Sequence, residues 1–269
     1  MNYANYNNIT TTSKKVKEGS IFISIDLNVE HISEAINNKA ALIISEKKIN
    51  DNINNIVVKN IKYYYTYLFK KIHQLNLDNF KIIAITGTDG KTTTAKMIYD
   101  TITSRYPAVY IGTLGIISKN KTIKTINTTP DIEIIYETLL MAKKEKIKYI
   151  ILEASSEGIL AKRLLGIKLD IVIFTNLSHE HLNTHKNMNE YFNCKKKILK
   201  SLKKDGVLIT NAEDFYGRKL KFQNTINYGL HKGNISTIDI NLEKNKTSLV
   251  IKCFNKIDLI NIPFVGIYN

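Results

Sequence analysis

From Phe80 onward, short apolar runs alternate with amphipathic segments, and this alternation constrains the fold more than any other feature of the sequence. Strands are expected at KIIAIT, AVYIG, YIILEAS and DIVIFTN, and helices at KTTTAKMIYDTIT and IEIIYETLLMAKKE. Strands that are apolar throughout are typical of parallel sheets covered by helices on both faces. We therefore expect a doubly wound, mostly parallel α/β domain whose ligands bind beyond the carboxyl ends of the strands.

A smaller α/β unit is expected before this domain. Strands and helices alternate there too, in the segments SIFISI, NVEHISEAINN, AALIIS, NIVVKN and IKYYYTYLFKKIHQ. The polar connection at 75–79 marks the boundary, so we expect domains at residues 1–78 and 79–269. Short strands are also expected after Gly206, at VLITN, STIDINL and SLVIKCF.

Composition narrows the classes of function. No apolar run approaches the ~18 residues of a membrane span, and the N-terminus lacks the pattern of a signal peptide, so a cytoplasmic protein without a membrane partner is expected. The net charge of +15 comes mostly from lysines spread along the chain, without an RNA-binding motif, which predicts no nucleic-acid partner. Cys194 and Cys253 are too few and too far apart for a disulfide framework or a metal cluster.

The segment ITGTDGKTTT joins the first strand after Phe80 to the first helix. A glycine-rich loop in that position points backbone N–H groups and the positive end of a helix dipole at an anion. We expect a phosphate site in which Lys91 reaches the outer phosphates and Thr92 offers its hydroxyl to Mg²⁺. The strict pattern G-x-x-x-x-G-K-[ST] is not met, because Ile85 occupies its first position, and an ordinary βα turn is the alternative. The candidate cofactor-binding residues are Gly87, Thr88, Asp89, Gly90, Lys91, Thr92 and Thr93.

Two further segments bear potential metal ligands. Glu153 ends the apolar run YIILE, where a metal explains a carboxylate better than a core does, because burial of an unpaired charge is costly. A capping or salt-bridged Glu is the alternative. His181 and His185 have the i, i+4 spacing of a zinc pair, but Leu182 follows His181 where zincins have Glu, so zinc is not expected.

The helix expected near 187–203 has an apolar stripe with a lysine in its middle. The stripe consists of Met188, Tyr191, Phe192, Ile198, Leu199 and Leu202. At 100° per residue Lys195 falls within it, whereas Lys196, Lys197, Lys200 and Lys203 fall outside. Withdrawal from water lowers the pKa of a lysine, and the neutral amine can react with carbon dioxide to form a metal-binding carbamate. A lysine that snorkels at the edge of the stripe is the alternative.

Taken together, these segments resemble the Mur ligases, and among them the MurE type, which adds the third amino acid of the cell-wall stem peptide. The matching pieces are ITGTDGKTTT, NTTPD, LEASSEGILAKRL, FTNLSHEHLNTH and EYFNCKKKIL, which cover 82–199, with a weaker match at TSKKVKEGSIFISI. Three residues depart from the family pattern. Asp89 replaces the usual Asn, Glu157 a His, and Ala161 a Gln.

The resemblance implies a set of site residues. Lys91 and Thr92 would bind ATP and Mg²⁺, and Glu153, His181 and a carbamylated Lys195 would hold the metals; the candidate catalytic residues are therefore Lys91, Glu153, His181 and Lys195. The UDP-N-acetylmuramoyl dipeptide would contact Asn127, Thr128, Thr129, Ser155 and Arg163, with Ser13 near the uridine.

The resemblance also implies the reaction, in peptidoglycan synthesis. ATP would phosphorylate the carboxylate of UDP-N-acetylmuramoyl-L-Ala-D-Glu, and the amine of diaminopimelate or lysine would attack the acyl phosphate. The sequence ends at FVGIYN, which in the family leads into the domain that binds the amino acid, so a truncated chain or a separately encoded C-terminal domain is expected. The alternatives are a folylpolyglutamate-synthase-like or other Mur-related ligase, and a non-catalytic binder of nucleotide or UDP-sugar.

Overall fold

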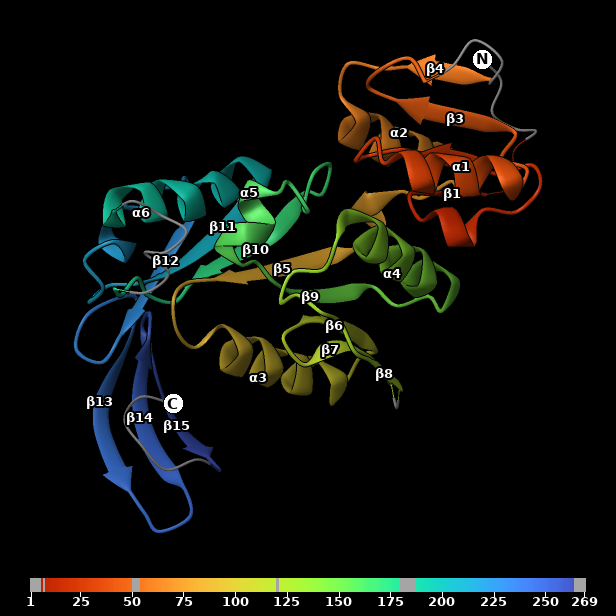
Figure 1. Ribbon diagram of the computed structural model, residues 1–269. Helices are drawn as coiled ribbons and strands as arrows, with labels where there is room; N and C mark the ends of the chain where they lie inside the picture. Colours follow the sequence, from red (N-terminus) through yellow and green to blue (C-terminus); the bar gives the residue numbers. More distant parts are fainter. Residues whose placement is uncertain (1–5, 7, 50–53, 120, 180–186, 264–269) are drawn as a thin grey trace. The chain divides into compact units, whose positions relative to one another are not determined.

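The computed structural model describes residues 6, 8–49, 54–119, 121–179 and 187–263 (Figure 1). The chain divides into two compact units. The first comprises Met1–Asn79, Asp131–Lys146 and Leu164–Ile167, and the second comprises Phe80–Pro130, Ile147–Arg163 and Lys168–Asn269. No helix in these described ranges has both the length and the hydropathy of a bilayer span.

The first unit is built on a four-stranded parallel sheet of order β1-β2-β3-β4. The strands are β1 (Ile9–Thr10), β2 (Ile21–Ile23), β3 (Leu42–Ser45) and β4 (Asn55–Val57), and the helices are α1 (Val29–Asn37), α2 (Ile61–Ile72) and α4 (Ile132–Lys144). The side chain of Asn28 caps the first turn of α1. Ile32 of this helix packs in a buried cluster with Phe22 and Ile43 of the sheet.

Helix α4 belongs to the first unit by its contacts, although the sequence places it after the expected boundary. Glu133 in its first turn is buried and accepts hydrogen bonds from the hydroxyl of Thr10 (2.7 Å) and the N–H of Thr11 (3.2 Å). Tyr136 packs edge-on against Tyr65 of α2. The two units therefore do not correspond to the expected division of the chain between residues 78 and 79. Helix α4 follows that point in the sequence but packs against residues that precede it.

The second unit is built on an 11-stranded sheet of order β15-β14-β13-β12-β11-β10-β5-β9-β6-β7-β8. From β13 to β6 every neighbouring pair is parallel, and antiparallel strands extend both edges. The strands are β5 (Lys81–Thr86), β6 (Ala108–Gly112), β7 (Gly115–Ser118), β8 (Lys121–Ile123), β9 (Tyr149–Glu153), β10 (Leu169–Phe174), β11 (Leu202–Asn211), β12 (Thr225–Gly229), β13 (Ile235–Leu242), β14 (Thr247–Cys253) and β15 (Lys256–Ile262). The helices of this unit include α3 (Lys91–Thr103), α5 (Ser156–Leu160) and α6 (Met188–Lys196). The predicted α/β class with a mostly parallel sheet is confirmed.

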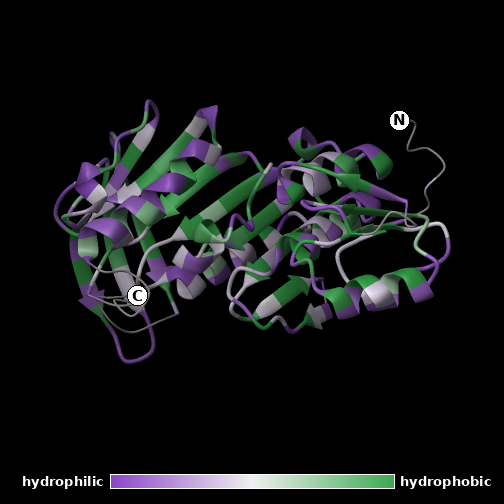
Figure 2. Ribbon diagram, turned by 45° about the horizontal axis from the view of Figure 1, so that its top comes forward, coloured by the Kyte–Doolittle hydropathy of each residue, from purple (hydrophilic) through white to green (hydrophobic). Residues whose placement is uncertain are grey.

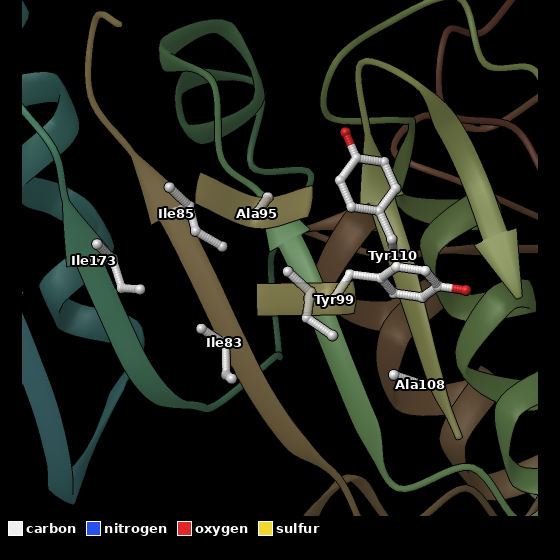
Figure 3. Packing of buried hydrophobic residues seen from close by; sticks show 8 residues of the cluster. Ile83, Ile85, Ala95, Tyr99, Ala108, Tyr110 and Ile173 are labelled. Carbon is white, nitrogen blue, oxygen red and sulfur yellow. The ribbon is translucent and has the colours of Figure 1, made fainter. Parts of the chain in front are cut away.

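The centre of this sheet is covered by α3. Ile83 and Ile85 of β5 and Ile173 of β10 form a buried cluster with Ala95 and Tyr99 of the helix (Figure 3). Figure 2 shows hydrophobic residues along the strands and hydrophilic residues on the connecting segments. The apolar runs of the sequence are thus the strands that are buried beneath helices.

Some elements differ from the expected pattern. The helix expected over 187–203 ends as α6 at Lys196 and continues as a 3₁₀ helix over Lys197–Ser201. The tighter turn still leaves Ile198 buried and Lys200 exposed. Strands β1, β7, β8, β12 and β15 were not expected. Strands β1, β7 and β8 have only two to four residues, too few for a periodic pattern. Strands β12 and β15 have five and seven residues but are half-buried and largely exposed, so they lack a buried apolar run.

Asp170, near the start of β10, ties three neighbouring strands together. Its carboxylate accepts hydrogen bonds from the N–H of Ile82 (2.9 Å) and the Nζ of Lys81 (3.1 Å) on β5, and from the Nζ of Lys203 (2.9 Å) on β11. Burial acts to raise the pKa of Asp170, but the hydrogen bonds from Lys203 and Ile82 outweigh it and hold this pKa below its ordinary value.

The substitution Asp170→Asn should therefore destabilise the second unit in a pH-dependent way. We expect the free energy of unfolding at neutral pH to fall by about 1–3 kcal/mol, because charge-assisted hydrogen bonds are lost. The folded-state pKa lies below the unfolded one, so the carboxylate stabilises the fold above the unfolded pKa, and this stabilisation disappears as the pH falls through the folded pKa. Urea unfolding at neutral pH and at about pH 3 measures both effects. An equal loss at both pH values, or an equal loss in the exposed control Asp258→Asn, would contradict this account.

Candidate functional site

The phosphate loop, residues 87–92, connects β5 to α3 with a backbone that requires glycine at two positions. Gly87 and Gly90 have φ angles of 152° and 74°, which other residues rarely adopt. A Cβ on Gly87 would also overlap the hydroxyl of Thr175. Gly90 is the N-cap of α3 and has no side chain to occupy the first N–H groups of the helix. The loop is therefore suited to bind an anion through its backbone.

The segment after β10 holds this loop in place. The N–H of Thr88 donates to the carbonyl of Asn176 (3.0 Å), and the N–H of Asp89 donates to Asn176 Oδ1 (2.9 Å). The hydroxyl of Thr175 donates to the carbonyl of Asp89 (2.6 Å). Thr175 and Asn176 are not among the predicted site residues. Their position directly after a strand that pairs with β5 is the signal that would have found them.

Asp89, the departure from the family pattern within the loop, has an exposed side chain. Its Oδ2 accepts a hydrogen bond from the hydroxyl of Ser178 (3.0 Å). This bond fixes the position of a negative charge in a loop that is otherwise suited to anions. Coulomb repulsion from the carboxylate opposes the binding of phosphate there.

Three predicted cofactor-binding residues, Lys91, Thr92 and Thr93, are the first residues of α3. The Nζ of half-buried Lys91 donates to the carbonyl of Thr88 (2.7 Å), which places the ammonium group over the loop. The hydroxyl of Thr92 donates to Glu153 Oε2 (2.9 Å), and Thr93 is exposed. The structure thus brings Lys91, Thr92 and Glu153 together at the loop.

Glu153, at the end of β9, is fully buried and fully hydrogen-bonded. Its Oε1 accepts from the Tyr110 hydroxyl and the Thr113 N–H (3.2 Å), and its Oε2 accepts from the hydroxyls of Thr92 (2.9 Å) and Thr113 (3.1 Å). Burial, and then the hydrogen bond to Glu153, raise the pKa of Tyr110, so the phenol remains a donor. Sequence reasoning missed Tyr110 and Thr113, whose only signal is their place on and just after the strand beside β9.

Thr129 connects the end of β9 to the start of α5. Its buried hydroxyl donates to the carbonyl of Glu153 (2.9 Å) and accepts from the N–H of Ser155 (2.8 Å). Ser155 caps α5 by accepting from the N–H of Gly158. The Nη1 of Arg163 donates to the carbonyl of Thr129 (2.9 Å). Three predicted substrate-binding residues, Thr129, Ser155 and Arg163, therefore form one group beside Glu153.

Of the other predicted substrate-binding residues, Thr128 lies close to Glu153, whereas Ser13 lies in the first unit. The hydroxyls of Thr128 and Thr113 are hydrogen-bonded (3.1 Å), which places Thr128 close to the carboxylate site. Asn127 is half-buried. Ser13 lies in the first unit, where its buried hydroxyl donates to Glu34 Oε2 (2.5 Å).

Lys195 is buried, as the apolar stripe predicts, with 1% of its surface exposed. Its Nζ donates to the carbonyl of Gly87 (2.8 Å) and lies 4.7 Å from the ring centroid of Tyr191. Burial, with a smaller contribution from the charge of Lys91, lowers the pKa of Lys195 to about 7. A large share of the Lys195 side chain is therefore a neutral amine at neutral pH, directly beneath the phosphate loop.

The ligands around the loop match the chemistry of a hard divalent cation. Mg²⁺ prefers oxygen ligands such as carboxylates together with phosphate oxygens. Thr92 and Glu153 present a hydroxyl and a carboxylate beside a loop that is suited to bind an anion. His181 and His185 lie outside the described residues. Within the part of the chain that the structure describes, no three His, Cys, Asp or Glu side chains gather into a metal-binding group.

Comparisons with known proteins identify the family of the chain. The Mur ligase middle domain matches residues 85–269. The UDP-N-acetylmuramoyl-L-alanyl-D-glutamate--2,6-diaminopimelate ligase of Fusobacterium nucleatum subsp. nucleatum is 30% identical over 281 residues, which cover 98% of this chain and 56% of that protein. The chain spans about half the length of the curated relatives it matches.

Solved structures share the fold. A structure of a UDP-N-acetylmuramoyl-L-alanyl-D-glutamate--2,6-diaminopimelate ligase superposes with a TM-score of 0.82 at 24% identity, and the match covers 98% of this chain and 57% of that one. The MurF ligase from Thermotoga maritima in complex with ADP has a TM-score of 0.67 at 20% identity and covers 97% and 59%. Because the family match extends over more than half of the sequence, the chain belongs to the Mur ligase family and contains its middle domain.

Proposed function

We propose that the chain is the nucleotide-binding and substrate-binding part of an ATP-dependent amide ligase of peptidoglycan precursor synthesis. The observation that carries the proposal is the convergence of the phosphate loop, Lys91 and the Thr92–Glu153 hydrogen bond at one edge of the parallel sheet. The names of the curated relatives support the reaction class. Since both ATP and a UDP-linked precursor are cytoplasmic substrates, we propose a cytoplasmic reaction.

The proposed reaction has two steps. A carboxylate oxygen of UDP-N-acetylmuramoyl-L-Ala-D-Glu attacks the γ-phosphorus of ATP, and ADP leaves. The amine of diaminopimelate or lysine then attacks the acyl carbon, the C–O bond to phosphate breaks, and the ammonium proton is released to solvent. Splitting the condensation in this way makes phosphate, instead of hydroxide, the leaving group.

The residues of this chain bind and orient the reactants. The N–H groups of residues 90–92, at the uncapped start of α3, and the ammonium of Lys91 would hold the phosphates of ATP and stabilise the transferred charge. Thr92 and Glu153 would hold Mg²⁺, which neutralises phosphate charge when bound. We propose His181 and a carbamylated Lys195 as further metal ligands.

The dipeptide substrate would bind beside this group. Support comes from the hydrogen bonds that join Thr129, Ser155 and Arg163, and from the contact of Thr128 with Thr113. Asn127 completes the proposed group, and Ser13 of the first unit would lie near the uridine. A C-terminal domain that binds the amino acid, supplied by a longer chain or a separate one, is part of the proposal.

The function is tested by phosphate release from ATP. The purified chain is assayed with Mg²⁺, UDP-N-acetylmuramoyl-L-Ala-D-Glu and bicarbonate, with and without a C-terminal domain from a related ligase. We expect release to require the dipeptide and to fall at least about 100-fold in Lys91→Ala, because the transferred charge loses its cation. The control Lys96→Ala, five residues further along α3 and half-buried like Lys91, should release phosphate at the wild-type rate. Nucleotide binding without dipeptide-dependent release would favour a non-catalytic binder, and release with a folate substrate would favour a folylpolyglutamate-synthase-like ligase.

Asp89→Asn should bind nucleotide more tightly than the wild type. The substitution removes a negative charge beside the proposed phosphate site, and the amide oxygen can still accept from Ser178. We expect the Kd for ADP, measured by calorimetry at low salt, to fall roughly threefold to tenfold, and the difference to shrink at high salt. Unchanged affinity at low salt would show that the Asp89 carboxylate does not face the bound phosphates.

Carbamylation of Lys195 should increase as its ammonium group loses a proton and becomes a neutral amine. Because the folded-state pKa is lowered to about 7, the neutral and reactive form increases as the pH rises through 7. In ¹³C-labelled bicarbonate, we expect a carbamate NMR signal that grows between about pH 6 and pH 8 and is missing in Lys195→Met. The exposed control Lys196→Met should retain the signal. A signal that survives in Lys195→Met would place the modification on another lysine.

A further inference from the structure

The carboxylate of Glu153 meets a tyrosine from the neighbouring strand. Tyr110 of β6 and Ile151 of β9 are register partners in a parallel pair. Side chains of such partners lie on the same face of the sheet, and so does Glu153, two residues after Ile151. The long phenol of Tyr110 spans the remaining distance along the strand, and its hydroxyl donates to Glu153 Oε1.

The hydroxyl of Tyr110 has a defined hydrogen-bonding role. It accepts from the N–H of Leu114 (3.3 Å), and its single hydrogen is donated to Glu153. The whole side chain is buried. Its ring packs edge-on against Tyr99 with 6.2 Å between centroids, and the two phenol oxygens point in different directions (Figure 3). The phenol therefore has one stable orientation, and Oε1 is the atom it fixes.

Gly112 shows how closely the two groups fit. A Cβ at this position would overlap Glu153 Oε1 and would lie 2.5 Å from the hydroxyl oxygen of Tyr110. The absence of a side chain at residue 112 is thus what lets the carboxylate and the phenol meet. No larger residue could occupy this place without displacing Glu153.

We propose that Tyr110 is a positioning residue for metal binding. By holding Oε1, it directs Oε2 toward the hydroxyl of Thr92, so that these two oxygens form a preorganised pair for Mg²⁺ beside the phosphate loop. The inference rests on the proposed function, because it assigns to Glu153 the role of a metal ligand. It adds a residue from β6, outside the phosphate loop, to the metal site.

The test separates metal binding from nucleotide binding. The Kd of ADP for the full chain is measured by calorimetry in Mg²⁺ and in EDTA, and the ratio of the two values gives the enhancement by the metal. In Tyr110→Phe we expect the Kd in EDTA to stay at the wild-type value and the enhancement to fall roughly tenfold, as for other residues that orient a metal ligand. In Glu153→Gln the enhancement should be lost.

Tyr99→Phe is the matched control, because it removes a phenol oxygen from the same buried cluster without touching Glu153. It should retain the wild-type enhancement, and circular dichroism checks that each variant is folded.

An unchanged enhancement in Tyr110→Phe, with loss in Glu153→Gln, would overturn the inference and leave the proposed function intact. An equal loss of affinity in Mg²⁺ and in EDTA would also overturn it, in favour of a structural role. A wild-type chain that does not bind ADP under either condition would overturn the proposed function itself.

Discussion

The position of β5 between β9 and β10 is the constraint on which the candidate site depends. Neighbouring parallel strands end at the same edge of a sheet. For this reason the phosphate loop after β5, the carboxylate at the end of β9 and the amide of Asn176 after β10 come together. Ile85 and Glu153 are register partners, so the carboxylate lies beside the last residues of β5. Thr175 and Asn176, which follow β10, hold the loop through hydrogen bonds with Thr88 and Asp89. Gly90 leaves the first N–H groups of α3 without a side-chain cap.

Two buried ionisable side chains in this site are accommodated in opposite ways. Glu153 accepts four hydrogen bonds, which offset the loss of hydration of its carboxyl group in the interior. Lys195 has a carbonyl and an aromatic ring as its described contacts, and the nearby charge of Lys91 opposes its own. Its pKa falls instead. The first arrangement suits a charged metal ligand, and the second suits a reactive neutral amine.

Asp89 and Glu157, two of the residues that differ from the motifs of the resemblance, both bring a negative charge close to the loop. Asp89 is anchored to Ser178, which fixes where the extra charge of the loop lies. Glu157 lies in the first turn of α5, where the helix dipole favours a negative charge. The charge of Glu157 acts to raise the pKa of Lys195 and so opposes the effect of burial. The charges of Asp89 and Glu157 therefore contribute to the electrostatics around the loop, whereas Gly87 and Gly90 set its backbone conformation.

The sequence alone determined the longer, strongly apolar elements around the candidate site. KIIAIT is β5, AVYIG is β6, KTTTAKMIYDTIT is α3, and Lys195 is buried, because hydrophobic periodicity depends on the order of neighbouring residues. Only the tertiary structure decided which strands are neighbours. That choice brings Tyr110 to Glu153 across 43 residues and Asn176 to Asp89 across 87. Contacts of Glu133 and Tyr136 with distant residues likewise join α4 to the first unit. Such pairings result from cooperative packing of distant segments, which no local pattern encodes.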